Sequence, residues 1–424
     1  MKLVINSIYD FILANKKKIK QVSLLYSASI ANIFLGIGTS IIVTRNLGPE
    51  AYGDYNLLLY IFTFLVSIVN FGFFISASRL LVFSYSSIRS RKIYGASLIL
   101  TFAIFVIMVI GLSFYAKFDE NLHLKGLTKI FVLLIPFSFI FPLRACLDQL
   151  LRGNNLIKDL SVFRFGPKAV YLVLLLLFLS FSFINLKTVL ISYYLGFLII
   201  FLLIIIKIKP IFKSTRYRLN ELYLMNKRYG FHVYTGALFG YGLGRVTGLL
   251  LSYFGADNVD VGFFSLALMI CTPLSFIPRV VGTTFFKSFA YIKSLPRQLT
   301  IVTIFVSFTA LMLMIIFIKP VILFLYSEDY IRVVPIAVLV AIGVMFYGFG
   351  DYFNYFLRAH GKGKSLRNSA ILSGISLLIA NVLLIPKYGA LGAGAAKIFG
   401  GFVYVLTLII YYKRFIAIKM KNSR

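Results

Sequence analysis

The 424-residue sequence predicts an all-α membrane protein with about twelve transmembrane helices in two six-helix lobes. Hydrophobic residues make up 60% of the chain, above the roughly 45–50% of soluble domains, and such an excess needs lipid as solvent. Apolar stretches of about twenty residues, each long enough to cross a hydrocarbon core of ~30 Å as a helix, recur from end to end. Basic residues gather in alternate loops, and the chain carries an internal repeat.

The first predicted helix begins near Gln21, directly after a cluster of lysines that ends at Lys20. It ends at the turn Arg45-Asn46-Leu47-Gly48 without a small-residue cleavage site, so we interpret it as a retained helix and not as a cleavable signal. Further apolar segments follow, and every connection between them is short except 209–228. The predicted spans are 21–43, 55–83, 94–116, 127–151, 161–184, 188–208, 229–252, 260–288, 298–318, 332–358, 366–385 and 391–412.

The basic residues predict the orientation of these helices. Loops on the side of the two termini hold 29 of the 44 lysines and arginines, whereas the opposite loops hold seven, together with eight of the thirteen acids. Because basic loops stay in the cytoplasm, we place both termini and the 209–228 loop there. Topology and contact with membrane lipid headgroups then account for most of the formal net charge of +31, and we expect no nucleic-acid partner.

An internal repeat divides the chain into halves. The turn around Gly48 resembles the turn around Gly255, 207 positions later, and Leu151-Arg152-Gly153 matches Leu357-Arg358-Ala359 at a spacing of 206. A period of six helices keeps both copies in one orientation, which defines a parallel repeat about the membrane normal; coincidence in a low-complexity membrane sequence is the alternative. The predicted domains are an N-terminal six-helix lobe at 1–208, a cytoplasmic linker at 209–228 and a C-terminal six-helix lobe at 229–424.

Three short motifs carry a family resemblance. The turn after the first helix reads RNLGPEAYGDY at 45–55, the second helix ends with Asn70-Phe71-Gly72 and Ser76-Ala77-Ser78-Arg79, and residues 386–396 read PKYGALGAGAA. In these motifs the chain resembles the polysaccharide-transporter branch (O-antigen or lipid-linked oligosaccharide flippases) of the multidrug/oligosaccharidyl-lipid/polysaccharide exporter superfamily. They are turn and packing features, specific for the branch and not for the substrate.

The resemblance implies a V-shaped, exporter-type pair of lobes that works by alternating access in the bacterial inner membrane. It implies a flippase for undecaprenyl-pyrophosphate-linked oligosaccharides, such as O-antigen or capsule repeat units, with a polymerase and chain-length machinery as further partners. Lipid II flippases of the superfamily usually have two more helices, and its drug exporters lack so dense a set of intramembrane cations. The alternatives are another exporter of amphipathic small molecules and a membrane polysaccharide polymerase.

Charged residues inside the predicted spans indicate where a substrate would bind, because a charge at the bilayer centre costs roughly 2.5–3.5 kcal/mol and needs a wet cavity or a partner. Arg245 and Arg279 lie deep in their helices with no acid within four residues. Lys397 lies about two turns into the last helix, where pairing with Asp351 is the structural alternative. Guanidinium groups bind pyrophosphate and acidic sugars through charge-assisted, bidentate hydrogen bonds, so we predict that these cations bind the substrate.

Other in-span charges complete the predicted site. Arg79 lies near the cytoplasmic end of the second helix, and Lys168 lies one turn beyond Arg164 on the same helix face. Arg144 is four residues before Asp148, a spacing that favours a local ion pair. The candidate substrate-binding cations are Arg245, Arg279, Arg79, Lys397, Lys168 and Arg144, and the candidate coupling or ion-pair acids are Asp351 and Asp148.

Glycines and prolines predict irregular helices. Gly236, Gly240, Gly244 and Gly248 form a four-residue stripe, which indicates close helix packing or a helix that bends during transport. Prolines in the fourth and eighth spans predict kinks; these are Pro136, Pro142, Pro273 and Pro278.

Nothing in the sequence indicates catalysis. The two cysteines lie in apolar spans and the three histidines are scattered, so neither a disulfide framework nor a metal site is expected. We find no phosphate-binding glycine loop and no nucleophile elbow, and the non-cytoplasmic loops are too short for a large catalytic loop. The sequence therefore predicts a transporter, with no catalytic residue, metal or cofactor.

Overall fold

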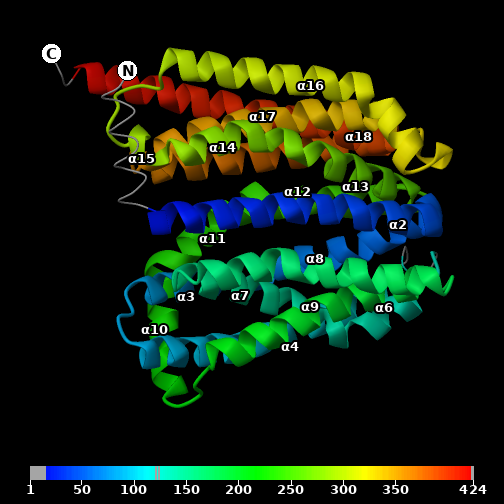
Figure 1. Cartoon of the computed structure of the whole chain (residues 1–424), viewed down its shortest axis with the longest axis horizontal. Coiled ribbons are helices and arrows are strands. Elements are labelled where there is room, and N and C mark those ends of the chain that lie inside the picture. The colour runs from blue at the N-terminus through cyan, green and yellow to red at the C-terminus, as the bar shows by residue number, and fades with distance from the viewer. Residues whose placement is uncertain (1–15, 120–121, 123–124, 422–424) are drawn as a thin grey trace. The chain divides into compact units, whose positions relative to one another are not determined.

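The computed structural model describes residues 16–119, 122 and 125–421, and within these residues every regular element is a helix (Figure 1). The first half contains α2 (Lys16–Val69), α3 (Phe73–Val82), α4 (Ser87–Phe118), α6 (Thr128–Leu134), α7 (Ile140–Gly153), α8 (Ile157–Ser180), α9 (Leu186–Ile208) and α10 (Thr215–Met225). The second half contains α11 (Phe231–Ala237), α12 (Leu243–Phe254), α13 (Val259–Cys271), α14 (Phe276–Thr284), α15 (Phe286–Phe289), α16 (Arg297–Leu325), α17 (Val333–Ala359) and α18 (Gly363–Lys421).

Two of these helices are broken at a glycine. Gly48 in α2 has φ 74° and Gly389 in α18 has φ 51°, both in the left-handed region that L side chains rarely adopt. After the second break, the Asp260 carboxylate accepts a hydrogen bond of 2.8 Å from the Ala390 N–H, so it replaces a backbone partner lost at the break. α18 therefore holds two of the predicted spans, whereas α2 holds the first predicted span and the beginning of the second, which continues in α3.

The described residues contain eight helices that are long and apolar enough to cross a membrane, or nine if the bent pair of α6 and the run from Pro136 to Gly153 forms one span. This number counts the broken helices α2 and α18 once each. It does not include the predicted span 229–252, because π-helical turns divide that span into short helices. One such turn, η3 (Leu238–Gly242), lies between α11 and α12. The chain is a multi-pass membrane protein, as the sequence predicts.

Prolines interrupt two helices where the sequence predicts kinks. The 3-10 segment η1 (Pro136–Phe139) separates α6 from α7 with a bend of 47°. A second 3-10 segment, η4 (Thr272–Ser275), contains Pro273 and separates α13 from α14. Pro142 and Pro278 lie in the first turns of α7 and α14, where the missing N–H removes no intrahelical hydrogen bond.

The chain forms two compact, discontinuous units. Unit 1 takes its described residues from 1–39, 72–110 and 136–231, and unit 2 takes its residues from 40–71, 111–135 and 232–424. The predicted lobes at 1–208 and 229–424 are units of sequence repetition. Grouping by contact in one conformation does not test them, so those boundaries stay a prediction.

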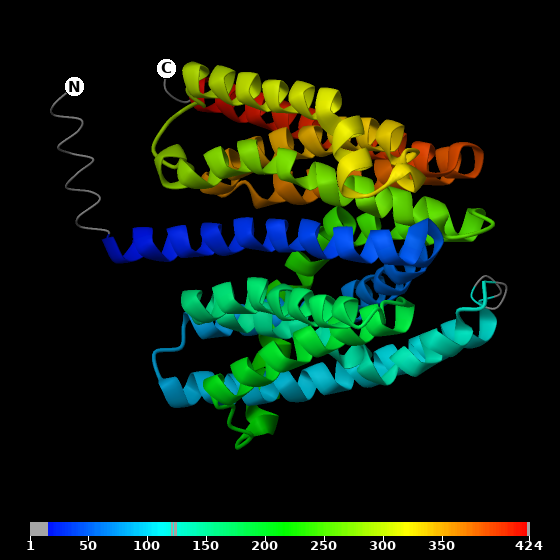
Figure 2. The same cartoon turned by 45° about the vertical axis from the view of Figure 1, so that its right-hand side comes forward.

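Glycine contacts bring the helices of unit 1 together. α8 packs along α9, and α3 packs along α7 (Figure 2). A Cβ at Gly153 would come within 2.5 Å of the Ser78 carbonyl oxygen, and one at Gly196 would come within 2.6 Å of the Pro167 carbonyl oxygen. These helices touch through their backbones, as small residues allow in membranes.

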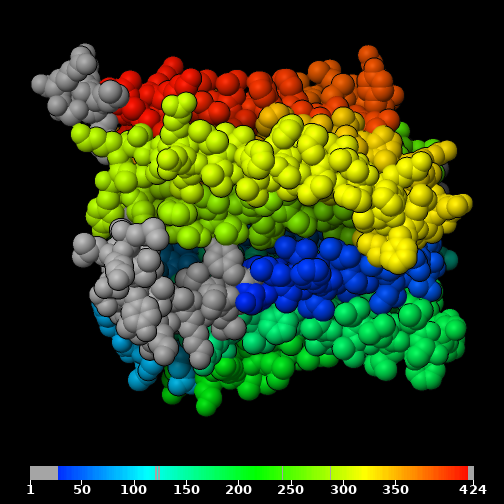
Figure 3. Space-filling model, turned by 45° about the horizontal axis from the view of Figure 1, so that its top comes forward, coloured from blue at the N-terminus to red at the C-terminus, as the bar shows by residue number. Residues whose placement is uncertain are grey.

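In unit 2, α17 packs against α13, α14, α16 and α18. A Cβ at Gly350 would lie 2.2 Å from the Tyr404 ring, so this glycine permits the contact between α17 and α18. Figure 3 shows α16 in yellow-green as an outer surface of the unit. Its exposed side chains include Phe305, Phe317 and Phe324, which identifies this surface as one that faces lipid.

A polar network joins the first-half segments of unit 2 to its later helices. The Lys125 ammonium donates to the Ser252 carbonyl at 2.6 Å and to Asn258 Oδ1 at 3.1 Å, and the Asn258 amide donates to Asp54 Oδ1 at 2.6 Å. Burial lowers the pKa of Lys125, while the nearby carboxylates of Asp257 and Asp54 act in the opposite direction.

Candidate functional site

The in-span cations divide into two kinds according to their partners. Arg279 and Arg164 each form an ion pair with a carboxylate. The others have no carboxylate partner among the residues that the structure describes. Four of these form one cluster in each unit, Arg144 with Lys168 and Arg245 with Lys397, and we describe the clusters separately.

Arg279 is neutralised by an acid on another helix. Its Nε and Nη2 both donate to Asp351 Oδ2 at 2.9 Å, so α14 is tied to α17. Tyr404 of α18 donates to the other carboxylate oxygen at 3.1 Å, and the Asn354 amide donates to the Tyr404 hydroxyl at 3.0 Å. The sequence placed Arg279 among unpaired cations because its partner is 72 residues away. The alternative pairing of Asp351 with Lys397 is wrong, since Asp351 pairs with Arg279.

Asp148 also pairs differently from the prediction. Its carboxylate lies 2.6 Å from Arg152 Nη2 and 3.5 Å from Arg164 Nη2. The predicted pair with Arg144 is wrong, because the Arg144 guanidinium lies over the Phe197 ring, 4.9 Å from its centroid. On α7, Asp148 has an arginine four residues before it and another four residues after it. The structure pairs it with Arg152, and Arg144 packs on α9 instead.

The cluster of unit 2 consists of Arg245 on α12 and Lys397 on α18, two helices that contact each other, and the positive charge of Arg245 acts on Lys397. Lys397 Nζ lies 4.6 Å from the centroid of the Tyr347 ring, and this cation–π contact takes the place of an acid. Arg245 is exposed and makes no ion pair or hydrogen bond within the described chain. Its charge also acts on Tyr60, whose hydroxyl is 3.0 Å from the hydroxyl of Ser265.

The glycine stripe next to Arg245 has a packing role at three of its four positions. A Cβ at Gly248 would lie 2.2 Å from the Tyr60 ring, one at Gly240 would lie 3.3 Å from Ala370, and one at Gly236 would lie 3.4 Å from Arg367. No side chain or distant backbone atom lies within 4 Å of a Cβ at Gly244. Close packing is therefore confirmed at Gly248 and Gly240, Gly236 makes an ordinary contact, and bending of this helix during transport stays a prediction. The helix contains the π-helical turn η3.

The cluster of unit 1 consists of Arg144 on α7 and Lys168 on α8, whose charges also repel. Lys168 Nζ donates to the Asn32 carbonyl on α2 at 3.3 Å, and it lies 2.8 Å from where a Cβ at Gly36 would be. The aromatic rings beside Arg144 form a continuous group, with Tyr193 packed on Phe197 at 4.8 Å between centroids. The Arg144 guanidinium therefore lies next to an aromatic group, in place of a carboxylate.

Arg79 stands apart from both clusters. It is exposed in the last turn of α3, and its guanidinium lies 4.7 Å from the centroid of Phe83 and 5.3 Å from that of Tyr229. Two rings thus hold the cation at the helix end. Its predicted contact with substrate stays a prediction.

The two clusters share one chemistry. Each joins one arginine to one lysine, from two different helices, with aromatic rings as neighbours and without a carboxylate partner in the described chain. An arginine offers a planar fork of donors and a lysine a compact point charge, a combination suited to phosphate oxygens. Sequence reasoning missed Tyr60, Tyr347 and Phe197, because nothing distinguishes them from the other 25 tyrosines and 43 phenylalanines.

Comparison with known structures shows the class of protein that this fold defines. The chain is similar to the lipid II flippase MurJ in an inward closed conformation, with a TM-score of 0.72 and 18% identity over 93% of this chain and 89% of that one. It is also similar to an inward-facing multidrug resistance MATE family transporter of the MOP superfamily, with a TM-score of 0.68 and 15% identity over 93% and 96%. The all-α exporter fold is confirmed.

Sequence comparison gives the family. Residues 19–286 match the model of the polysaccharide biosynthesis protein family, and the chain belongs to that family. A curated relative, the uncharacterized membrane protein MJ1068 of Methanocaldococcus jannaschii, is 24% identical over 287 residues, which are 64% of this chain. The match spans 55% of that relative's length.

Proposed function

We propose that this protein is a flippase that moves undecaprenyl-pyrophosphate-linked oligosaccharide repeat units, such as O-antigen or capsule units, from the cytoplasmic to the outer leaflet of the bacterial inner membrane. It would act by alternating access, with both termini in the cytoplasm. The observation that carries the proposal is the pair of Arg245 and Lys397, two cations that lie on neighbouring membrane helices with no carboxylate partner in the described residues.

The energetics of this pair support an anionic substrate. A charge in the middle of a bilayer costs roughly 2.5–3.5 kcal/mol, and two like charges side by side add repulsion. A pyrophosphate group would relieve this repulsion, because it supplies negative oxygens to the Arg245 fork and to the Lys397 ammonium at once. The family and the fold support a lipid-linked, sugar-bearing substrate, and the same cations disfavour export of small amphipathic cations.

The lateral surface of unit 2 is compatible with a substrate that keeps its lipid in the bilayer. α16, α17 and α18 line an apolar groove of about 350 Å³. It is lined by side chains that include Ile304, Phe346 and Leu406, and the hydroxyls of Thr300 and Tyr352 face each other at 3.1 Å. Such a surface accepts acyl or polyprenyl chains alike, so it supports a membrane-embedded tail without selecting one.

Deletion of the gene tests the function. We expect lipid-linked repeat units to accumulate in the cytoplasmic leaflet and the surface polymer to disappear. A polymer of normal length and amount, in a strain without a second transporter, would contradict the proposal. Lipid-linked units that reach the outer leaflet but stay unpolymerised would favour a polymerase instead.

A further inference from the structure

The segment between α9 and α11, predicted as a linker, contains the helix α10, which is fixed to the end of unit 1. The Ile211 N–H donates to the Arg91 carbonyl at 2.9 Å, and Arg91 Nε donates to the Lys209 carbonyl at 2.6 Å. A Cβ at Gly95 would come within 2.2 Å of the Ile211 carbonyl oxygen, so the segment touches α4 through its backbone. α10 therefore has a defined position where α9 ends and α4 begins (Figure 1).

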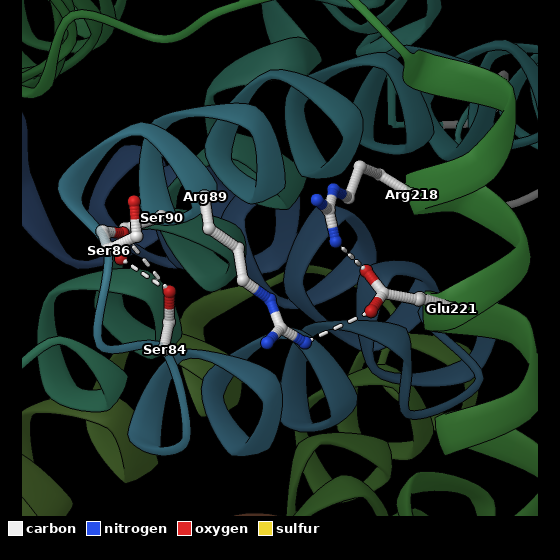
Figure 4. A network of polar contacts seen from close by, with 6 residues as sticks. All are labelled: Ser84, Ser86, Arg89, Ser90, Arg218 and Glu221. Carbon is white, nitrogen blue, oxygen red and sulfur yellow. Dashed lines mark hydrogen bonds and ion pairs between the residues drawn. The ribbon is translucent and has the colours of Figure 1, made fainter.

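A polar network holds the only acid of this segment toward the protein (Figure 4). Glu221 accepts a hydrogen bond from Arg89 Nη2 at 3.0 Å through one oxygen and from Arg218 through the other. The turn before Arg89 is fixed by the Ser90 hydroxyl, which donates to the Ser84 hydroxyl at 3.0 Å. Both oxygens of the Glu221 carboxylate therefore accept a hydrogen bond from an arginine of unit 1.

The opposite face of α10 carries only cations, aromatics and neutral groups. Leu222 is 1% exposed, and Arg218 and Leu219 are half-buried at helical spacing from it. Outside this buried side of the helix, Tyr217 is 62% exposed and Tyr223 is 56% exposed. The exposed residues of the face are Arg216, Tyr217, Asn220, Tyr223 and Leu224, continued by Lys227 and Arg228.

A shallow concavity of about 870 Å³ runs along this face, and no acid lines it. Its lining includes residues with hydroxyl, amide and guanidinium donors, namely Ser214, Asn220 and Arg216. Tyrosine rings flank these donors, and tyrosine is the residue type that sits at the level of lipid headgroups with its ring toward the chains and its hydroxyl toward water.

We propose that this face of α10 docks on the anionic phospholipid headgroups of the leaflet that it borders. The proposal rests on the cytoplasmic orientation given with the proposed function, because anionic lipids give the cytoplasmic leaflet its negative surface potential. Arg216, Lys227 and Arg228 supply the attraction, and Tyr217 and Tyr223 supply the apolar contact. The ion pairs of Glu221 with Arg89 and Arg218 neutralise the one negative charge of this segment, which would otherwise repel the lipid surface.

The test uses the full-length protein in lipid nanodiscs, without substrate. A nitroxide label at Asn220→Cys reports the position of the face, because the natural cysteines, Cys146 and Cys271, are both buried. In phosphatidylcholine with phosphatidylglycerol we expect the label to be shielded from an aqueous nickel chelate and open to oxygen, and in phosphatidylcholine alone to be open to the chelate. Arg216→Gln should lower the ratio of docked to undocked helix about fivefold, the equivalent of ~1 kcal/mol per basic residue near a charged surface.

Arg297→Gln is the matched control, since it removes one exposed cation at the start of α16, outside α10, and should leave the label unchanged. Equal access of the chelate in both lipid mixtures would overturn the proposal, as would an equal effect of Arg297→Gln and Arg216→Gln. Shielding that persists in detergent without phospholipid would mean a protein contact and would also overturn it. Docking without transport would refute only the proposed flippase function. Transport without docking would refute only the inference about α10.

Discussion

Two regions of unit 2 place an arginine inside the membrane and give it opposite surroundings. Arg279 donates two hydrogen bonds to Asp351, and Tyr404 donates to the second oxygen of that carboxylate. Arg245 has no such partner within the described chain, and its neighbour Lys397 carries the same charge. The first arrangement is satisfied by protein groups alone, whereas we propose that an anion completes the second. The comparison therefore supports a packing role for Arg279 and makes Arg245 the residue that we propose contacts the substrate.

The largest effect is expected at Arg245. Arg245→Ala should reduce transport about ten- to one-hundred-fold, because it removes roughly 1.5–3 kcal/mol of charge-assisted hydrogen bonding to the substrate. The amount of inserted protein should stay normal, since Arg245 makes no ion pair or hydrogen bond within the described residues. Transport measured per molecule, with abundance measured in the same membranes, separates the two effects. A parallel fall of abundance and transport would place Arg245 with Arg279.

The pair of Arg279 and Asp351 should instead affect stability. Asp351→Ala leaves the guanidinium without a partner, and we expect a loss of about 1–3 kcal/mol, less than for a fully buried pair because the Arg279 side chain is 38% exposed. The double variant Arg279→Ala/Asp351→Ala should lose less than the sum of the single variants, as measured by thermal unfolding in detergent. Additive losses would show that the pair does not hold α14 to α17.

Two glycines on either side of Arg245 sharpen the comparison further. Gly248→Ala should disturb Tyr60 beside Arg245, at a cost of about 1–3 kcal/mol from overpacking, and should lower transport. Gly244→Ala is the matched control, because its methyl group meets no neighbour within 4 Å. Equal behaviour of the two variants would mean that the Tyr60 contact does not support the site.

The smallest effect is expected for Arg245→Lys, which keeps the charge and loses the fork of donors. A severalfold decrease in transport is expected if both a bidentate contact and the local field contribute. Activity equal to that of Arg245→Ala would assign the whole effect to the fork, and full activity would assign it to the field. Initial rates at low substrate concentration make the distinction.

Periodic and local patterns made the fold predictable from the sequence. Apolar length gave the spans, and Pro136 and Pro273 gave two of the interruptions, because these signals act within a few residues. α10 was not predicted, since its mean composition is polar and its position depends on Arg91 and Gly95, which are distant in sequence. The orientation of the protein, with its basic loops and both termini in the cytoplasm, remains a prediction from the distribution of lysine and arginine in the loops.

The site was predictable in its residue types and not in its pairings. The intramembrane cations were found because a charge in an apolar span is conspicuous. Which of them is neutralised depends on contacts between helices, such as Asp351 with an arginine 72 positions away. Spacing on one helix was ambiguous at Asp148, which has an arginine four residues away on either side: the structure pairs it with Arg152, whereas Arg144 lies over the Phe197 ring.

The central claim is that an unpaired cation cluster in this protein carries a lipid-linked anion across the membrane. Its most direct test is translocation of a fluorescent polyprenyl-pyrophosphate-linked glycan in proteoliposomes, followed by access of a membrane-impermeant quencher. We predict rapid translocation by the natural protein and by Arg279→Ala/Asp351→Ala, and translocation about ten- to one-hundred-fold slower for Arg245→Ala. A natural protein no faster than empty liposomes, or an Arg245→Ala variant as fast as the natural protein, would contradict the account.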